Sequence, residues 1–506
     1  MLALLCIFAL AASPIPSAAG PRLGPIQTIE VAVSGPQAFD ALVKGGYDVG
    51  NVSGNRVTLY ATPDEVQQLR KDGFTPVAVS PVAEKAYQSY DSIVQTLQNA
   101  AADHPEICRL RKIGASVMGR DLWAVLVTNN PDTEEDEPEF KYAGSIHGDE
   151  PVGAEMCLRS LDLLLTEYGS DDRIATLVDT TALWILPVMN PDGFETISRY
   201  NANGFDLNRS FPIYLNDFTE SVFREPSPDL EGRPPEVVAV AQWTLDNSFV
   251  LSANFHSGAL VVNYPYDDDG KWSGIDAPTP DDALFRDIAR RYSVHNEPMW
   301  SSTEFPDGIT NGNTWYTVRG GMQDWNYRYA GCNEVTIELS TTKNPAPSAL
   351  PALWEDNRES MLSYAEACHI GVRGIVTDSA TGEPLWAEVR AVGIDHPVYT
   401  DPDVGDYHRM LLPGEYSLRY AASGYTPRVV TDVAVSSGEA TRVDVELTQP
   451  DVNGDGVADA ADVQRTINAI LGISECPACD LDGGGVTSTD LQILINVILD
   501  RPQPDN

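Results

Sequence analysis

The stretch "IHGDEPVG", residues 146–153, decides how the rest of the chain is interpreted. It follows "FKYA" (140–143), which is typical of a strand edge. Pro151 suits the first turn of a helix, because its missing N–H would have no partner there. His147 and Glu150 therefore stand three residues apart where a strand gives way to a helix, and both side chains suit zinc. Such a pair is common by chance, so the remaining sequence has to decide between a polar turn and half of a metal site.

Two further residues favour the metal site. A catalytic zinc needs three protein ligands and an open position for water. Among the seven histidines, His256 in "NFHSG" follows an apolar strand and is the best third ligand. Glu338 in "EVTIEL" lies in a second apolar strand, where a buried charge needs a reason.

Length and charge limit the class of protein. A chain of 506 residues predicts several domains. Its net charge of -41 excludes nucleic-acid binding, and no apolar run is long enough to span a membrane. Residues 1–19 predict a signal peptide and secretion, although no Lys or Arg precedes the apolar run. A buried N-terminal helix is the alternative, and Pro14 and Pro16 disfavour it.

The pattern changes three times along the chain. Residues 26–80 predict a small unit of strand, helix, strand, helix, strand, either a propeptide that blocks the site or a permanent accessory domain. Residues 86–368 alternate apolar strands with amphipathic helices, an α/β pattern, and their acidic loop 130–140 is predicted to be solvated surface. Residues 369–449 alternate with period two and predict an all-β sandwich.

The last segment, 450–506, contains a repeated acidic loop followed by a helix. The first loop, 451–462, has calcium-ligand chemistry, with a sharp turn at Gly456. Its oxygen donors would be the side chains of Asp451, Asn453, Asp455 and Asp462 and the carbonyl of Val457. The second loop is one residue shorter, so Asp480, Asp482 and Asp490 would bind calcium weakly. The duplication resembles a dockerin domain, for which cohesin is the implied partner; a calcium-stapled module without a partner is the alternative.

Six cysteines remain beyond the predicted signal peptide, and an even number in an exported chain permits disulfides. Cys476 and Cys479, in "CPAC", allow a redox pair, half of a zinc site, a local disulfide or free thiols. The last two are favoured, because no second pair completes a zinc site.

Six motifs in order carry a family resemblance. They are "HGDE" (147–150), "NPDG" (190–193), "RYNANGFDLNRSFP" (199–212), "NFHSGALVVNYPYD" (254–267), "GITNGNTWYTVRGGMQDWNY" (308–327) and "EVTIELS" (334–340). Residues 86–368 thereby resemble the zinc metallocarboxypeptidases, specifically the branch of carboxypeptidases N, E, M and D. The resemblance implies an α/β fold with a mixed eight-stranded sheet and helices on both faces. The β region that follows resembles the transthyretin-like domain of that branch.

The resemblance also implies a catalytic centre. Zinc would be held by His147, Glu150 and His256, and Asp206 would orient a ligand histidine. Glu338 matches the general base that takes a proton from the attacking water.

Further residues match the family's substrate-binding positions. Arg199 would stabilise the developing oxyanion. Asn208 and Arg209 match the pair that binds a terminal carboxylate, for which the planar fork of arginine is suited. Tyr316 matches a mobile tyrosine that closes over the substrate.

Asp267 matches the acid that pairs with a C-terminal Lys or Arg, and Gln323 matches a polar residue of the same pocket. The competing interpretation is an acidic surface loop, since Asp268 and Asp269 follow. Ser257 stands where the family has glycine.

The leading hypothesis is a secreted, monomeric zinc carboxypeptidase that removes Lys or Arg from the C-termini of peptides or proteins. One alternative is an amidase of the same fold acting on cell-wall peptides or small acyl-amino acids. The other is a catalytically inactive binding module carried by the dockerin-like segment.

Overall fold

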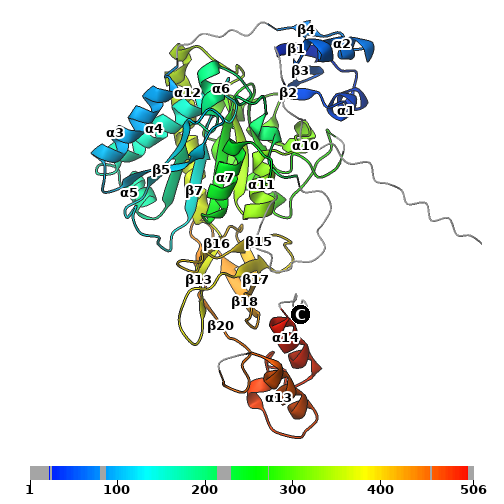
Figure 1. Cartoon of the computed structure of the whole chain (residues 1–506). Coiled ribbons are helices and arrows are strands. Elements are labelled where there is room, and N and C mark those ends of the chain that lie inside the picture. The colour runs from blue at the N-terminus through cyan, green and yellow to red at the C-terminus, as the bar shows by residue number, and fades with distance from the viewer. Residues whose placement is uncertain are drawn as a thin grey trace, which may run out of the picture.

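The structure, a computed structural model, describes residues 22, 26–79, 87–213, 230–271, 273–455 and 458–499. Figure 1 shows the chain passing from a small N-terminal unit through a large α/β unit and a β unit to a helical C-terminal unit. The predicted signal peptide, Gly456 and Val457 lie outside the described residues. None of the described helices is long and apolar enough to cross a membrane.

The large unit is built on an eight-stranded mixed sheet, as predicted, with the order β11-β10-β12-β9-β7-β8-β6-β5. Its central strands pair in parallel, β8 with β7, β7 with β9 and β9 with β12, whereas β10–β12, β6–β8 and β5–β6 are antiparallel. The strands are β5 (Cys108–Ala115), β6 (Asp121–Val127), β7 (Glu139–Ala143), β8 (Ala182–Leu186), β9 (Phe249–His256), β10 (Leu260–Tyr264), β11 (Ile309–Asn311) and β12 (Asn333–Leu339).

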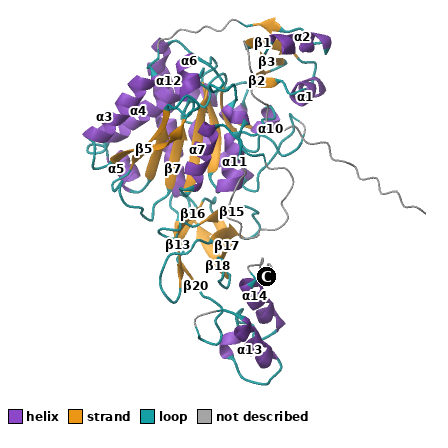
Figure 2. Ribbon diagram, viewed as in Figure 1, coloured by secondary structure: helices purple, strands orange, loops and turns teal. Residues whose placement is uncertain are grey.

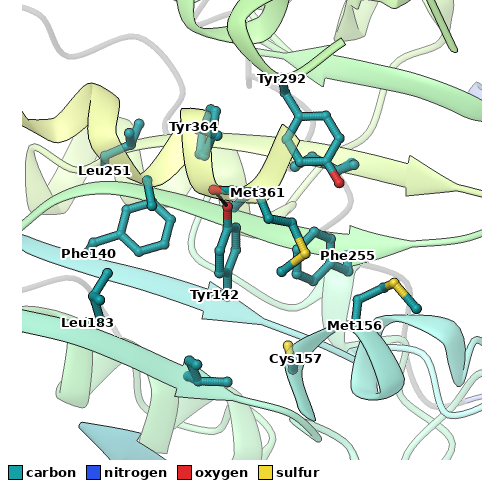
Figure 3. Close-up of a cluster of buried hydrophobic side chains, with 14 of the residues drawn as sticks. Phe140, Tyr142, Met156, Cys157, Leu183, Leu251, Phe255, Tyr292, Met361 and Tyr364 are labelled. Carbon is teal, nitrogen blue, oxygen red and sulfur yellow. Dashed lines mark hydrogen bonds between the residues drawn. The ribbon is translucent and has the colours of Figure 1, made fainter. Parts of the chain in front are cut away.

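Helices cover both faces of this sheet (Figure 2). They are α3 (Tyr90–Asp103), α4 (Val152–Glu167), α5 (Asp172–Asp179), α6 (Pro191–Thr196), α7 (Pro235–Leu245), α8 (Asp282–Ser293), α9 (Glu297–Trp300), α10 (Gly312–Trp315), α11 (Met322–Ala330) and α12 (Leu350–Ala365). One apolar core joins the sheet to α3, α4, α8 and α12, and a second joins it to α7 and α11. Figure 3 shows part of the first core, in which the Tyr142 hydroxyl donates to the carbonyl oxygen of Met361 at 2.8 Å.

The parallel pairing of the central strands determines where the predicted site residues lie. The strands β7, β9 and β12 all run in one direction, so their carboxyl ends meet at one edge of the sheet. Every residue of β9 and β12 is buried, as expected for strands covered on both faces. The residues that end or follow these strands therefore converge without any long loop.

The N-terminal unit is a four-stranded antiparallel sheet with two helices. It comprises β1 (Gln27–Ala32), α1 (Pro36–Lys44), β2 (Asp48–Ser53), β3 (Arg56–Ala61), α2 (Pro63–Lys71) and β4 (Val77–Ala78). The prediction of three strands was wrong, because it missed β2, whose sequence "DVGNVS" lacks strong alternation. A tight turn through Gly54, with φ of 57°, pairs β2 with β3.

The region after residue 369 forms two four-stranded sheets that share one apolar core, as a sandwich does. Its strands are β13 (Val372–Asp378), β14 (Glu388–Ala391), β15 (Pro397–Tyr399), β16 (Asp406–Arg409), β17 (Gly414–Ala421), β18 (Arg428–Val435), β19 (Thr441–Arg442) and β20 (Val445–Leu447). The acidic loop 130–140 lies against it: Asp136 forms ion pairs with Arg373 and Arg442. The prediction that this loop is only solvated surface was therefore wrong.

The C-terminal unit contains α13 (Ala460–Ile470) and α14 (Ser488–Ile498). Each is preceded by a loop that folds back on its first turn: Asp462 accepts from the backbone N–H of Val452, and Asp490 accepts from that of Leu481. Cys476 and Cys479 form a local disulfide, one of the predicted alternatives. Four further cysteines are buried free thiols: Cys108, Cys157, Cys332 and Cys368.

Candidate metal centre and active site

The three predicted metal ligands lie together at the carboxyl edge of the sheet. His147 follows β7, Glu150 precedes α4, and His256 is the last residue of β9. Glu150 Oε1 lies 3.2 Å from His147 Nδ1, and its Oε2 lies 2.9 Å from His256 Nδ1. One ligand atom from each residue falls within 4.8 Å of the others, and all three side chains are buried. This donor set and spacing fit a single zinc ion.

The groups behind the ligands support the same fit. His147 Nε2 lies 3.0 Å from Asp206 Oδ1, which leaves Nδ1 facing the other ligands. Burial lowers the pKa of His256 to about 4, so the imidazole is neutral and can coordinate a metal. Arg199 donates from Nε to Asp206 Oδ2 at 2.9 Å, and its Nη1 lies 3.6 Å from Glu150 Oε1. The arginine thus adjoins the centre without being one of its ligands.

Glu338 lies opposite His256 in the register between β12 and β9. Burial, together with the nearby Glu150 carboxylate, raises the pKa of Glu338 to about 7. Its Oε2 is buried and has no hydrogen-bond partner among the described residues. A buried carboxylate oxygen without a donor is costly, so the position suits a group that receives a proton during a reaction.

The proposed carboxylate-binding pair lies on a short 3-10 helix, Leu207–Arg209. Asn208 Oδ1 accepts from the backbone N–H of Met322 at 2.9 Å, and its Nδ2 lies 3.4 Å from His256 Nε2. The amide group therefore turns its nitrogen toward the metal ligands. Arg209 follows directly and lines the same cavity.

Asp267 is 3% exposed and lines the cavity with Arg209, so the surface-loop interpretation was wrong. Its Oδ1 accepts from Asn263 Nδ2 at 3.0 Å. Burial, and next the neighbouring Asp324, raise the pKa of Asp267 well above its usual value. Gln323 is buried beside these residues in the first turn of α11.

Comparison with known proteins gives this arrangement a family. Residues 93–360 match the zinc carboxypeptidase family, and residues 371–448 match the carboxypeptidase regulatory-like domain. The chain belongs to the zinc carboxypeptidase family. Human carboxypeptidase D is 41% identical over 373 residues, which are 70% of this chain but 26% of that protein. The rat carboxypeptidase N catalytic chain is 40% identical over 401 residues, which are 73% of this chain and 87% of that one.

A solved relative shows the fold alone. The crystal structure of carboxypeptidase A from Helicoverpa armigera superposes with a TM-score of 0.52 at 17% sequence identity, covering 68% of this chain and 98% of that chain. The regulatory-like match agrees with the predicted transthyretin-like region, 369–449.

In this zinc carboxypeptidase the N-terminal unit reaches the site through the strand β2 (Figure 1). The carbonyl oxygen of Val49 accepts from Arg209 Nη2 at 2.8 Å. The carboxylate of Asp48 accepts from the hydroxyl of Tyr200 at 2.5 Å and lies 3.8 Å from Arg199 Nε. The strand that the sequence did not reveal therefore contacts Arg199 and Arg209, two residues predicted to act on the substrate.

The same strand closes the cavity. Asn51 Nδ2 donates to the carbonyl oxygen of Gly258 at 3.0 Å, and Trp315 Nε1 donates to that of Val52 at 2.9 Å. Tyr316 is buried and belongs to an apolar cluster with the N-terminal unit. The enclosed cavity, lined also by Gly50, measures about 20 Å³. That volume holds a water molecule but no peptide.

Three residues of the site were missed by sequence reasoning. Lys343 Nζ lies 2.5 Å from Glu150 Oε1, Asp324 accepts from the backbone of Asp267, and Gly312 lies against the Asp267 side chain. Lys343 lies outside the six motifs, and Gly312 lies within the motif 308–327 without any side-chain chemistry that distinguishes it. Asp324 directly follows Gln323 in "GMQDW", which is the one signal that could have drawn attention to it.

Proposed function

We propose that the chain is a secreted zinc-dependent carboxypeptidase that removes Lys or Arg from the C-termini of peptides or proteins. The observation that carries the proposal is Asp267, a buried carboxylate that lines the same cavity as Arg209 and the three predicted metal ligands. Arg209 lies in the same cavity, but burial and the neighbouring Asp324 outweigh it and keep the pKa of Asp267 raised, so this acid disfavours an apolar occupant and favours a cationic one. The chain spans about a quarter of the length of its carboxypeptidase D relatives.

The residues divide the reaction between them. When bound, zinc lowers the pKa of a coordinated water toward about 7 and polarises the carbonyl group of the bond to be cut. Glu338 accepts the proton of the attacking water and returns it to the departing amine. Arg199 donates to the oxygen on which negative charge develops. Asn208 and Arg209 hold the terminal carboxylate, so the last peptide bond is the one presented for cleavage.

The N-terminal unit is proposed to be an inhibitory propeptide rather than a neutral accessory domain. Arg209 donates to the carbonyl oxygen of Val49, and the same guanidinium group would be needed to bind a substrate carboxylate. This contact supports the proposal. Productive binding would require β2 to leave this position.

Short acyl dipeptides ending in Arg or Phe test the specificity. Replacing Asp267 by Ala should lower kcat/KM for the Arg substrate by about 10- to 100-fold, the usual cost of a lost charged hydrogen bond, and change the Phe substrate little. An unchanged ratio of Arg to Phe cleavage would show that the pocket is not basic-selective. Glu338→Gln and chelation should each abolish both activities, and persistence of activity in Glu338→Gln would refute the mechanism.

For the C-terminal unit we retain calcium binding and a cohesin partner as proposals. In the second loop, oxygens of Asp480, Asp482 and Asp490 lie within 4.8 Å of one another. In the first loop Asp462 accepts from the backbone N–H groups of Val452 and Asn453, folding the loop around its acidic residues. Calorimetric titration of the whole chain with calcium should show one tight site that Asp462→Ala removes, and a weaker one that Asp490→Ala removes.

A further inference from the structure

Tyr60 brings an aromatic ring from the N-terminal unit against two cations that adjoin the predicted metal ligand Glu150. It lies on β3, opposite Asp48 of β2 in the antiparallel register, and only 4% of it is exposed. A Cβ atom at Gly50 would lie 2.3 Å from Tyr60 Cε2, so only glycine leaves room for the ring there. The ring is thus accommodated by the same strand whose Gly50 lines the cavity.

Two cations of the catalytic unit receive this ring. The Cζ atom of Arg199 and the Nζ atom of Lys343 each lie 4.9 Å from its centroid. Both cations also adjoin one metal ligand, since Arg199 Nη1 lies 3.6 Å and Lys343 Nζ 2.5 Å from Glu150 Oε1. A cation within about 6 Å of a ring centroid is attracted by the ring's quadrupole, and desolvation strengthens the attraction.

The catalytic unit contacts the aromatic ring of Tyr60 rather than its hydroxyl group. The Tyr60 hydroxyl is buried and has no hydrogen-bond partner among the described residues. An unpaired buried hydroxyl destabilises its position, so the ring must supply the favourable contacts. Phenylalanine should therefore suit the position at least as well as tyrosine.

The place of the Tyr60 ring corresponds to the place of one side chain of a bound peptide substrate. The terminal carboxylate is assigned to Arg209 and the last side chain to Asp267, whereas Arg199 is assigned to the carbonyl oxygen of the bond to be cut. That carbonyl belongs to the residue before the last one. The side chain of this penultimate residue accordingly falls near Arg199 and the neighbouring Lys343.

We propose that Arg199 and Lys343 form a subsite for an aromatic side chain on the penultimate substrate residue, and that Tyr60 occupies this subsite in the closed chain. The proposal rests on the proposed function, because it uses the direction in which a peptide C-terminus would bind. It adds a second determinant of substrate choice, on the other side of the cleaved bond from Asp267.

The test compares three acyl dipeptides that end in Arg and carry Phe, cyclohexylalanine or Ala before it, using the full-length, zinc-loaded chain. Cyclohexylalanine matches phenylalanine in size but has no π system, so it separates cation–π attraction from simple burial. Ratios of kcat/KM between substrates are independent of how often the N-terminal unit opens, because all three meet the same open molecules. Phe should exceed cyclohexylalanine by about fivefold, and Lys343→Met should reduce that ratio to about one or two. Lys112→Met, on the exposed surface, is the matched control and should leave the ratio unchanged.

The Tyr60 variants give a second, independent readout. Tyr60→Ala should raise kcat/KM for all three substrates several-fold by vacating the subsite, whereas Tyr60→Phe should leave kcat/KM at the wild-type values. A ratio of one between Phe and cyclohexylalanine in the wild type overturns the proposal, as does a ratio that Lys343→Met leaves intact. If Lys343→Met fails to fold, the wild-type ratio decides alone. Failure of the proposed function is distinguishable: no Arg would be released from any of the three substrates in wild type or in Tyr60→Ala.

Discussion

The charge of Asp267 is sensitive to what lies beside it. Its carboxyl group is buried next to a second acid, Asp324, and both effects raise the pKa of Asp267. An arriving Lys or Arg side chain would favour the ionised form again and gain a buried ion pair, whereas an apolar side chain would leave the acid uncompensated. At the scale of single residues, the burial and the neighbours of this one carboxylate should therefore set the proposed preference for a basic side chain.

A glycine makes room for that carboxylate. A Cβ atom at Gly312 would lie 1.9 Å from Asp267 Oδ1 and 2.9 Å from Asp267 Cα, closer than atoms can approach. Gly312→Ala should therefore displace Asp267 and lower kcat/KM for Arg substrates by at least tenfold more than for Phe substrates. Gly169→Ala is the control, since nothing lies within 4 Å of a Cβ atom there. Equal losses on both substrates would point to general disruption instead.

At the scale of one element, the first turn of α11 contacts both Asn208, predicted to bind a substrate carboxylate, and Asp267, predicted to set specificity. The backbone N–H of Met322 fixes Asn208, and the carboxylate of Asp324 accepts from the backbone N–H groups of Asp267 and Asp268 at 2.9 and 3.0 Å. Gln323 lies between these two residues. Three consecutive residues, Met322 to Asp324, thus connect the predicted carboxylate-binding pair to Asp267.

Asp324→Asn tests this coupling. The amide keeps the size of the side chain but offers one acceptor oxygen and no charge, so the loop carrying Asp267 should be held less firmly. We expect KM for Arg substrates to rise roughly five- to tenfold with little change in kcat, while the melting temperature stays within a few degrees. A purely structural role would instead lower stability and affect Arg and Phe substrates alike.

At the scale of the whole molecule, features marked by local motifs could be predicted from the sequence, whereas features that depend on contacts between distant residues could not. His147, Glu150, His256 and Glu338 lie at strand ends marked by local motifs, so their meeting followed from the parallel sheet. The strand β2 was missed because its sequence lacks strong alternation and because its contacts join distant residues. The Val49 carbonyl oxygen meets Arg209 and the Asn51 side chain meets Gly258, each more than 150 residues away in sequence. Lys343 and Gly312 were missed because their contacts, with Glu150 and with Asp267 respectively, form only after folding.

The junction between the catalytic unit and the sandwich belongs to this scale as well. Its acidic loop brings Asp136 to Arg373 and Arg442 of the sandwich, and places Glu137 near Asp406. Burial, followed by neighbouring carboxylates, raises the pKa of Glu137 to about 7. Because the chain carries a net charge of -41, carboxylates repel one another where its two acidic surfaces meet.

This junction should make stability depend on pH in a defined direction. The folded pKa of Glu137, about 7, exceeds its ordinary value of 4.5, so the folded chain binds more protons than the unfolded chain between these values. Stability is therefore lost as pH rises from about 4.5 to 7.5.

Glu137→Gln removes the charge but can still accept from Thr128, whose hydroxyl lies 2.8 Å from Glu137 Oε1. Relative to the wild type it should be stabilised by about 1–2 kcal/mol at pH 8, after allowance for partial exposure, and by nothing at pH 4.5. Calorimetric melting across this range, with Glu446→Gln on the exposed face of β20 as control, measures the difference; a gain at pH 4.5 as large as that at pH 8 would show that Glu137 is not the titrating group.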